Sequence, residues 1–356
     1  MLQKLQNNDV IVEDISHFHS ELNMACVRKN GLLLVSDELI SYVRSLLREE
    51  QPLLPQAAVD EWSELLSHLR YHWVTPLLYW KIGHLSPELR PPEVICTRMR
   101  EVFLASHTRY LTMARQLREV MDAFNRERID ILLIKGPALA LSVYPDPATR
   151  PFGDIDLLAR PDQYLKARSV LNQLSYRSQL DRFETFQELF NAEPFVHSAD
   201  ATKYFGVDVH WSLFQYHGLT RNNGVEEVLW NTQKVETSTL KFETLDRVNA
   251  LIYAAFHLIL HHPESMRLTW IGDIALLSQS LVYPVEWEVL QQRCSALKLS
   301  LAMQEALKLA QIWYGLQIPE KYSDLTKWLC PGEDEKSELA YLSRKEGPDI
   351  RLKGYF

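Results

Sequence analysis

The sequence predicts an α+β protein in which a central segment rich in strands lies between two mainly helical segments. Short aliphatic runs gather in the middle of the chain, at Ile131–Ile134 and after Asp154. Before and after this part, apolar residues recur at helical spacing instead. We expect three units, residues 1–125, 126–240 and 241–356, with no Gly/Ser-rich linker between them. These units are therefore predicted to share one packed body.

The N-terminal unit is predicted to be helical from residue 37 onward, whereas residues 1–36 predict no definite element. Helical spacing begins at Asp37, which is expected to be the N-cap, and a second helix is expected over residues 57–69. A proline-rich break at 87–92 precedes a long helix expected from Val94 toward Phe124. That helix would lead directly into the central strands.

The first central strand is predicted to end in a tight turn that can hold an anion. Ile131–Ile134 is followed directly by Lys135, Gly136 and Pro137. Gly136 allows close backbone approach, and Pro137 suits the first turn of a helix. A lysine beside a helix N-terminus favours a bound anion such as phosphate.

Two carboxylates open the next predicted strand. Asp154 and Asp156 lie two residues apart, so in a strand both side chains point to the same face. Carboxylates this close repel each other, and such a pair usually persists because a divalent cation lies between them. The alternative is a pair of solvated acids at the start of a strand.

Further strands are predicted at 176–180, 193–198 and 204–211, with helical segments at 161–174 and 183–190. The last of these strands alternates so that Asp208 and His210 share one face. Asp208 is therefore a candidate third carboxylate. His210 is interpreted either as a structural partner within the strand or as a site residue.

The C-terminal unit is predicted to be helical from Thr244, with a helix over 245–262 and further helices over 285–316, whereas the charged stretch after 332 has poor periodicity. His257 and His261 share a helix face at i and i+4. Zinc binding would need a third ligand, and Leu258 stands where zinc proteases carry glutamate. Packing and substrate contact are the other interpretations.

Together these motifs resemble the polymerase-beta-type nucleotidyltransferase superfamily. Within it, they resemble an uncharacterised bacterial family with the motif K-G, R-P-x-G-D-I-D-L and D-x-H-W. The three parts are present as Lys135-Gly136, residues 150–157 and residues 208–211. The resemblance implies a mixed sheet with flanking helices, with residues 126–240 as the nucleotidyltransferase core. In the first turn this chain has Gly136-Pro137-Ala138 where the superfamily usually has Gly-Ser, so a hydroxyl donor to phosphate is missing.

The resemblance also implies roles for particular residues. Asp154, Asp156 and Asp208 would bind Mg²⁺, or Mn²⁺ in its place, together with an NTP such as ATP, and Asp208 would help to activate the acceptor hydroxyl. The expected reaction transfers a nucleoside monophosphate to that hydroxyl and releases pyrophosphate. The residues expected to contact the nucleotide are Lys135, Gly136, Arg150, Gly153, His210, His257, His261 and Arg267.

Two other functions fit the same motifs. One is a catalytically weak or inactive module that binds a nucleotide or a partner protein, which the altered turn favours. The other is a nucleotidyltransferase that modifies RNA in the manner of a toxin, which would need a basic groove beside the acids.

Composition narrows the partners and the compartment. The formal net charge of −8 favours a small-molecule or protein acceptor over nucleic acid. The four cysteines are scattered, without metal-site or disulfide spacing. No secretory leader and no apolar run of roughly 20 residues is present, so we expect a cytoplasmic protein without a membrane segment.

Overall fold

A five-stranded mixed sheet with strand order β1-β2-β5-β4-β3 forms the centre of the fold. β2 pairs in parallel with β5, and the other pairs are antiparallel. The computed structural model describes residues 35–180, 191–198, 204–214, 230–238, 240–261 and 266–343. The strands are β1 (Ile131–Ile134), β2 (Asp154–Ala159), β3 (Tyr176–Ser178), β4 (Ala192–His197) and β5 (Gly206–His210). The predicted α+β class with a mixed sheet and flanking helices is confirmed.

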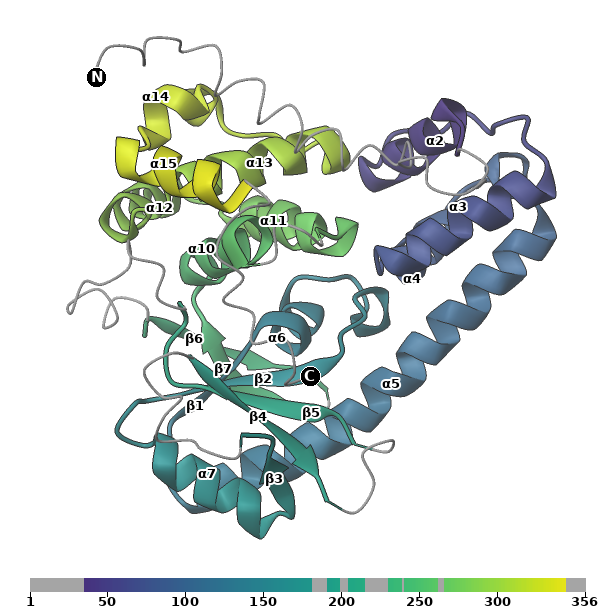
Figure 1. Ribbon diagram of the computed structural model, residues 1–356. Helices are drawn as coiled ribbons and strands as arrows, with labels where there is room; N and C mark the ends of the chain where they lie inside the picture. Colours follow the sequence, from purple (N-terminus) through teal and green to yellow (C-terminus); the bar gives the residue numbers. More distant parts are fainter. Residues whose placement is uncertain are drawn as a thin grey trace.

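The two faces of the sheet have different neighbours because side chains alternate along each strand. Ile155 and Leu157 of β2 belong to one hydrophobic cluster with the C-terminal half of α5 (Glu93–Arg126) and with α7 (Tyr164–Gln173). Leu158, on the opposite face, packs with the C-terminal helices. Figure 1 shows α5 and α7 on one side of the sheet and the helices α10–α13 (residues 247–314) on the other. Asp154 and Asp156 share the face of Leu158.

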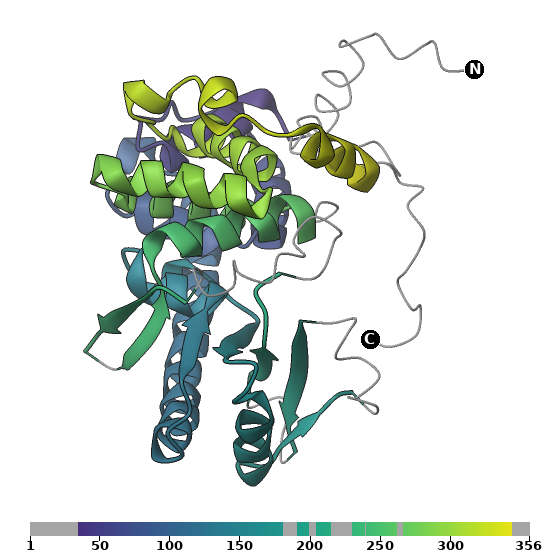
Figure 2. The same ribbon diagram turned by 90° about the vertical axis from the view of Figure 1, so that its left-hand side faces the viewer.

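The N-terminal helices form one end of the molecule and send a long helix down to the sheet. α5 packs through Ile95 and Met99 with its neighbouring helices, and through Leu117 and Phe124 with the sheet. Its 34 residues give a length of about 50 Å, and Figure 2 shows it descending from the helical part to the strands. The helices are α2 (Asp37–Leu47), α3 (Val59–Tyr71), α4 (Thr75–Ile82) and α5 (Glu93–Arg126).

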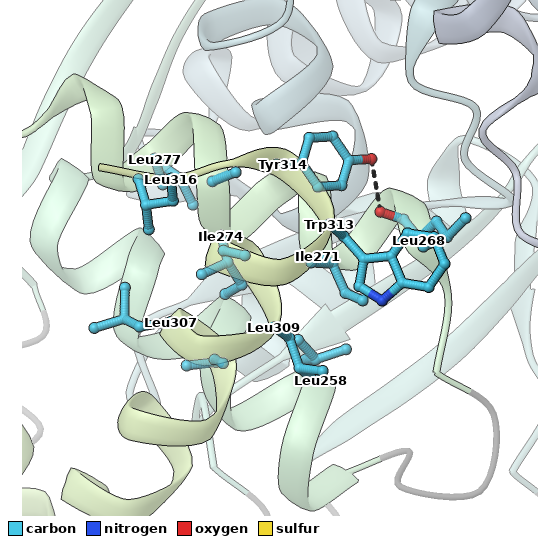
Figure 3. Packing of buried hydrophobic residues seen from close by; sticks show 14 of the residues in the cluster. Leu258, Leu268, Ile271, Ile274, Leu277, Leu307, Leu309, Trp313, Tyr314 and Leu316 are labelled. Carbon is cyan, nitrogen blue, oxygen red and sulfur yellow. Dashed lines mark hydrogen bonds between the residues drawn. The ribbon is translucent and has the colours of Figure 1, made fainter. Parts of the chain in front are cut away.

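The C-terminal helices share a hydrophobic cluster with α2–α4 and the start of α5. Figure 3 shows α11 and α13 packed through leucine and isoleucine side chains, with the Tyr314 hydroxyl donating to the Leu268 carbonyl at 2.8 Å. This bond fixes the N-terminal end of α11. The helices are α10 (Arg247–Phe256), the π-helical turn η3 (His257–His261), α11 (Leu268–Ser280), α12 (Pro284–Leu297), α13 (Ser300–Tyr314), α14 (Leu325–Leu329) and α15 (Glu333–Ser343).

Several predicted boundaries and elements are corrected. Ser36, not Asp37, caps α2, since its Oγ accepts from Leu39 N at 3.4 Å. Residues 232–245 form a hairpin, β6 (Thr232–Glu236) and β7 (Lys241–Leu245), where no strand was predicted. The next helix therefore begins after Asp246, whose carboxylate caps it at Asn249 N. Residues 333–343 are helical despite their poor periodicity. The predicted helix at 183–190 and residues 1–34 lie outside the described part.

One short helix links β1 to β2 and is central to the site. This helix, α6 (Lys135–Ser142), begins at the lysine itself, earlier than the proline-led start that the sequence indicated. It is followed by a 3-10 turn, η2 (Pro147–Thr149), which leads into β2. Among the described residues, no helix combines the length and the apolar character that a membrane span requires.

Candidate active site

The three acids come together because of the register of β2 and β5. Asp156 lies opposite Asp208 across this parallel pair, and Asp154 precedes Asp156 by two residues on the same strand. All three therefore project from one face of the sheet, which we call the acid face. Val207 and Val209 point the other way into the apolar core. The predicted sharing of one face by Asp208 and His210 is confirmed.

Lys135 neutralises the central acid. Its Nζ donates to Asp156 Oδ1 at 2.7 Å, and His210 Nε2 lies 3.0 Å from the same oxygen. The Lys135 and His210 nitrogens are 3.3 Å apart. Burial and the Lys135 charge lower the pKa of His210 to about 4, so its imidazole is neutral near pH 7. Asp156 is thus held by one cation and one neutral donor.

The three carboxylates differ in how well they are compensated. Burial opposes ionisation of Asp156, but Lys135 and His210 outweigh it and keep its pKa below the ordinary range. The charge of Asp156, followed by burial, raises the pKa of Asp154 to about 6. Burial, followed by the charges of Asp156 and Asp154, raises the pKa of Asp208 to about 7. Among the described residues, the positive charge of Lys135 does not offset these effects at Asp154 and Asp208.

The donor set fits a hard divalent cation. Mg²⁺ prefers carboxylate oxygens, and the raised pKa values of Asp154 and Asp208 are those of acids that lack a counter-cation. The three side chains do not stand at the spacing of a metal site in this structure, since no group of three or more His, Cys, Asp or Glu side chains does so within the described residues. Asp154, Asp156 and Asp208 are the residues that would hold the ion.

The backbone directly after β1 lies against the side chains of Phe152 and Arg150. Lys135 adopts a left-handed φ of 51°, and a Cβ on Gly136 would lie 2.8 Å from Phe152 Cβ and 2.9 Å from Arg150 Nη1. Only glycine fits there without displacement. The predicted close approach at Gly136 is therefore seen, and it joins the turn to the segment that precedes Asp154.

Arg150 makes a buried ion pair below this turn. Its Nε and Nη2 donate to Asp273 Oδ1 and Oδ2 at 2.8 and 2.6 Å, and only 5% of the residue is exposed. The Tyr144 hydroxyl lies 2.8 Å from Asp273 Oδ1. These contacts tie the loop before β2 to α11. Direct contact of Arg150 with a nucleotide stays a prediction.

A small pocket lies beside Lys135, between α6, β7, α10 and α11, and we call it the Lys135 pocket. His257 lines it, whereas His261 is not among its lining residues and packs near Phe256 and His257. Its cavity of about 40 Å³ is water-sized. The polar or aromatic residues that line it are Lys135, Arg150, Thr244, Tyr253, His257, Trp270 and Asp273.

Gly153 and Arg267 lie at the other end of the site, near Trp73. A Cβ on Gly153 would be 3.6 Å from Trp73 Cη2. The Arg267 guanidinium carbon stands 4.0 Å from the Trp73 ring centroid. Trp73 comes from the turn between α3 and α4, far away in sequence.

Sequence reasoning missed two of these neighbours. Tyr253, over which Lys135 Nζ lies at 5.7 Å, precedes His257 by four residues, so helical spacing could have placed it on the same face. Trp73 had no such signal, because only the tertiary packing of the N-terminal helices brings it to Gly153.

Comparison with protein families is consistent with this geometry. Residues 59–315, more than half of the chain, match the model of a family described as uncharacterised nucleotidyltransferase. The chain belongs to this family. Membership supports nucleotidyl transfer as the general type of activity. The matched range includes the acids, the turn after β1, the Lys135 pocket and Trp73.

Two solved structures show a distant likeness to this chain. One is the antibiotic-resistance factor ANT(2'')-Ia, with 13% identity, a TM-score of 0.37 and coverage of 54% of this chain and 96% of the other. The second is an antigenic nucleotidyltransferase-like protein from Paracoccidioides brasiliensis, with 15% identity, a TM-score of 0.34 and coverage of 56% and 91%. No curated protein matches the sequence.

Proposed function

We propose that the protein transfers a nucleoside monophosphate from an NTP to an acceptor hydroxyl in a Mg²⁺-dependent reaction. The observation that carries the proposal is the convergence of Asp154, Asp156 and Asp208 on one sheet face beside Lys135. Membership of a nucleotidyltransferase family supports it. When bound by these acids, Mg²⁺ would supply charge neutralisation for the triphosphate.

The side chains of the site have separate roles in this proposal. The acceptor oxygen attacks the α-phosphorus, the bond to the β-phosphate oxygen breaks, and pyrophosphate leaves. Lys135 lies beside the acids and neutralises the negative charge of the phosphates. Asp208 takes the proton of the acceptor hydroxyl, because a carboxylate positioned beside the reacting oxygen can act as a general base.

The acceptor is proposed to be a small molecule or a protein. A net charge of −8 disfavours a phosphate backbone, which is usually bound by clustered lysines and arginines. A small molecule or a protein that carries a hydroxyl does not need such a basic surface.

Two observations favour a second candidate function, which is binding of a nucleotide or partner without turnover. The turn reads Gly136-Pro137-Ala138 and lacks the hydroxyl that would contact phosphate. Lys135 already gives its charge to Asp156 at 2.7 Å. Release of pyrophosphate from an NTP separates the two, since only the first function produces it.

A thermal-shift panel tests the proposed function. The four NTPs, each with and without Mg²⁺, are added to the wild type, to Asp154→Asn and to Asp162→Asn, an exposed acid just beyond β2 that serves as a control. Binding at about 100 times Kd stabilises the native state by roughly 2.7 kcal/mol. We expect a Mg²⁺-dependent shift in the wild type and the control, and its loss in Asp154→Asn. A flat panel for the wild type would overturn the proposal.

A further inference from the structure

Arg267 stands among three aromatic rings at the edge of the site. Its guanidinium carbon lies 4.0 Å from the ring centroid of Trp73, 5.3 Å from that of Trp270 and 5.9 Å from that of Tyr71. We call these four residues the Arg267 cluster. Tyr71 is 55% exposed, so the cluster reaches the surface.

Arg267 contacts aromatic rings but forms no ion pair within the described residues. No carboxylate in the described ranges pairs with it, and its buried Nε has no hydrogen-bond acceptor there. A guanidinium flanked by aromatic faces presents a flat, cationic stacking surface. Such surfaces hold planar π-systems, and nucleobases stack both on aromatic side chains and on arginine planes.

The cluster is joined to both halves of the candidate site. Trp73 covers Gly153, the residue directly before the first acid, with its Cη2 3.6 Å from the place of a Cβ. Trp270 lines the Lys135 pocket, and its ring centroid lies 4.7 Å from that of His257. A ligand whose phosphates meet Lys135 and the acids would have its other end directed at these rings.

The backbone at Trp73 departs from what local preference favours. Trp73 has a φ of 56° just beyond the C-terminus of α3, a position at which glycine is usual. Trp73 N and Val74 N donate to Arg70 and Leu69 carbonyls, which closes the helix end. This helix end fixes the place of the Trp73 ring against Gly153.

We propose that the Arg267 cluster is the nucleobase-binding subsite, in which the base of the NTP stacks on Trp73, Trp270 and the Arg267 guanidinium. The inference rests on the proposed function and adds the location of the base. Stacking needs only a π-face, which the base has and the triphosphate lacks. The Arg267 cluster therefore binds the base, whereas Lys135 and the acids bind the triphosphate.

The test compares ATP with inorganic tripolyphosphate, both with Mg²⁺, by titration calorimetry. Arg267→Gln and Trp73→Leu should weaken ATP binding by about tenfold or more and leave tripolyphosphate binding unchanged within about twofold. Lys135→Ala, by contrast, should weaken both ligands. The matched control is Arg44→Gln. Like Arg267, Arg44 lies over a tryptophan ring, 5.1 Å from the centroid of Trp313, and its buried Nε has no hydrogen-bond partner among the described residues. Its helix, α2, lies far from the sheet in Figures 1 and 2.

The outcomes separate this inference from the proposed function. Equal losses for ATP and tripolyphosphate in Arg267→Gln would make Arg267 a phosphate ligand and overturn the base subsite. Unchanged ATP binding in both cluster variants would overturn it as well. A wild type that binds neither ligand would instead overturn the proposed function, and this inference would fall with it. Thermal unfolding of each variant checks that it is folded.

Discussion

Asp156 and Asp208 face each other across β2 and β5, yet the pKa of Asp156 is lowered and the pKa of Asp208 is raised. Asp156 has Lys135 Nζ at 2.7 Å and His210 Nε2 at 3.0 Å. Asp208 has burial and two neighbouring negative charges, which raise its pKa from 3.8 to about 7. The site therefore stores unfavourable electrostatic energy at Asp208 when it is ionised. Such destabilisation is common where a site is arranged for a bound cation.

This asymmetry predicts a pH-dependent stability. A carboxyl group whose folded pKa lies above its unfolded value binds more protons in the native state, so stability falls as pH rises from about 4 to about 7. Asp208→Asn removes that loss. Without metal, we expect the variant to be more stable than the wild type at pH 8, by a few kcal/mol at most since one pKa unit is about 1.4 kcal/mol.

Chemical denaturation at pH 5 and pH 8 in the presence of a chelator measures this difference. At pH 5 only part of the loss has developed, because Asp208 is still protonated in the folded state, so the variant should exceed the wild type by less at pH 5 than at pH 8. An Asn variant that is less stable than the wild type at pH 8 would show that the ionised carboxylate is stabilised by the fold.

The acids could be predicted from the sequence because their placement depends on local alternation. A spacing of two residues within β2, and alternation within β5, are properties of single strands. The pairing of Arg150 with Asp273, and the approach of Trp73 to Gly153, join segments that are far apart in the chain. No local pattern specifies such contacts, so they became visible only in the folded structure.

At the scale of elements, the first residues of α6, directly after β1, decide the geometry of the site. Gly136 lets α6 lie against the segment that leads into β2, where Phe152 and Arg150 stand. Arg150 in turn is fixed by Asp273 of α11. These contacts hold α6 and α11 against the segment that precedes β2, next to Lys135.

Adding one methyl group should disturb this turn. In Gly136→Ala the new Cβ would stand 2.8 Å from Phe152 Cβ, closer than packed atoms come, so the backbone must shift. We expect a loss of about 1–3 kcal/mol in the free energy of unfolding and weaker Mg²⁺-ATP binding. Gly332→Ala is the matched control because nothing lies within 4 Å of its Cβ. Equal stability of the two variants would argue against a tight turn.

The hairpin β6–β7 shows why an element can escape sequence reasoning. Its strand β6 alternates only between exposed and half-buried positions, so apolar periodicity is weak. The last residues of β7, Thr244 and Leu245, are buried and directly precede a strongly apolar helix. The helical pattern in the sequence therefore begins at Thr244, before the helix itself does. Long periodic helices such as α5 were predictable because their apolar face is continuous.

At the scale of the whole molecule, helices from both ends of the chain form one core. α2 and α13 are joined by the stacking of Arg44 on Trp313 and by Arg48 Nε, which donates to the Ile312 carbonyl at 3.1 Å. Leu39 and Leu307 belong to the same hydrophobic cluster. The N-terminal and C-terminal helical units are therefore expected to lose their structure together.

Hydrogen exchange measures this coupling. Leu307→Ala should create a cavity that costs about 2–5 kcal/mol and should speed amide exchange in α2–α4 as well as in α10–α13. Ile312→Ala on the same helix, where the side chain is 38% exposed, should change little. Faster exchange confined to the C-terminal helices would mean that the two ends unfold independently.

The central claim is that the acid face binds a divalent cation together with a nucleotide, and Mn²⁺ provides a spectroscopic probe of it. Electron paramagnetic resonance counts free Mn²⁺ during titration of the wild type, Asp154→Asn, Asp208→Asn and the control Asp162→Asn, each with ATP, and of ATP alone, whose own binding of Mn²⁺ is subtracted. We predict that the wild type and the control bind Mn²⁺ with ATP, and that each acid-face variant binds at least about tenfold more weakly. Equal Mn²⁺ binding by all four proteins would contradict the assignment of the acid face.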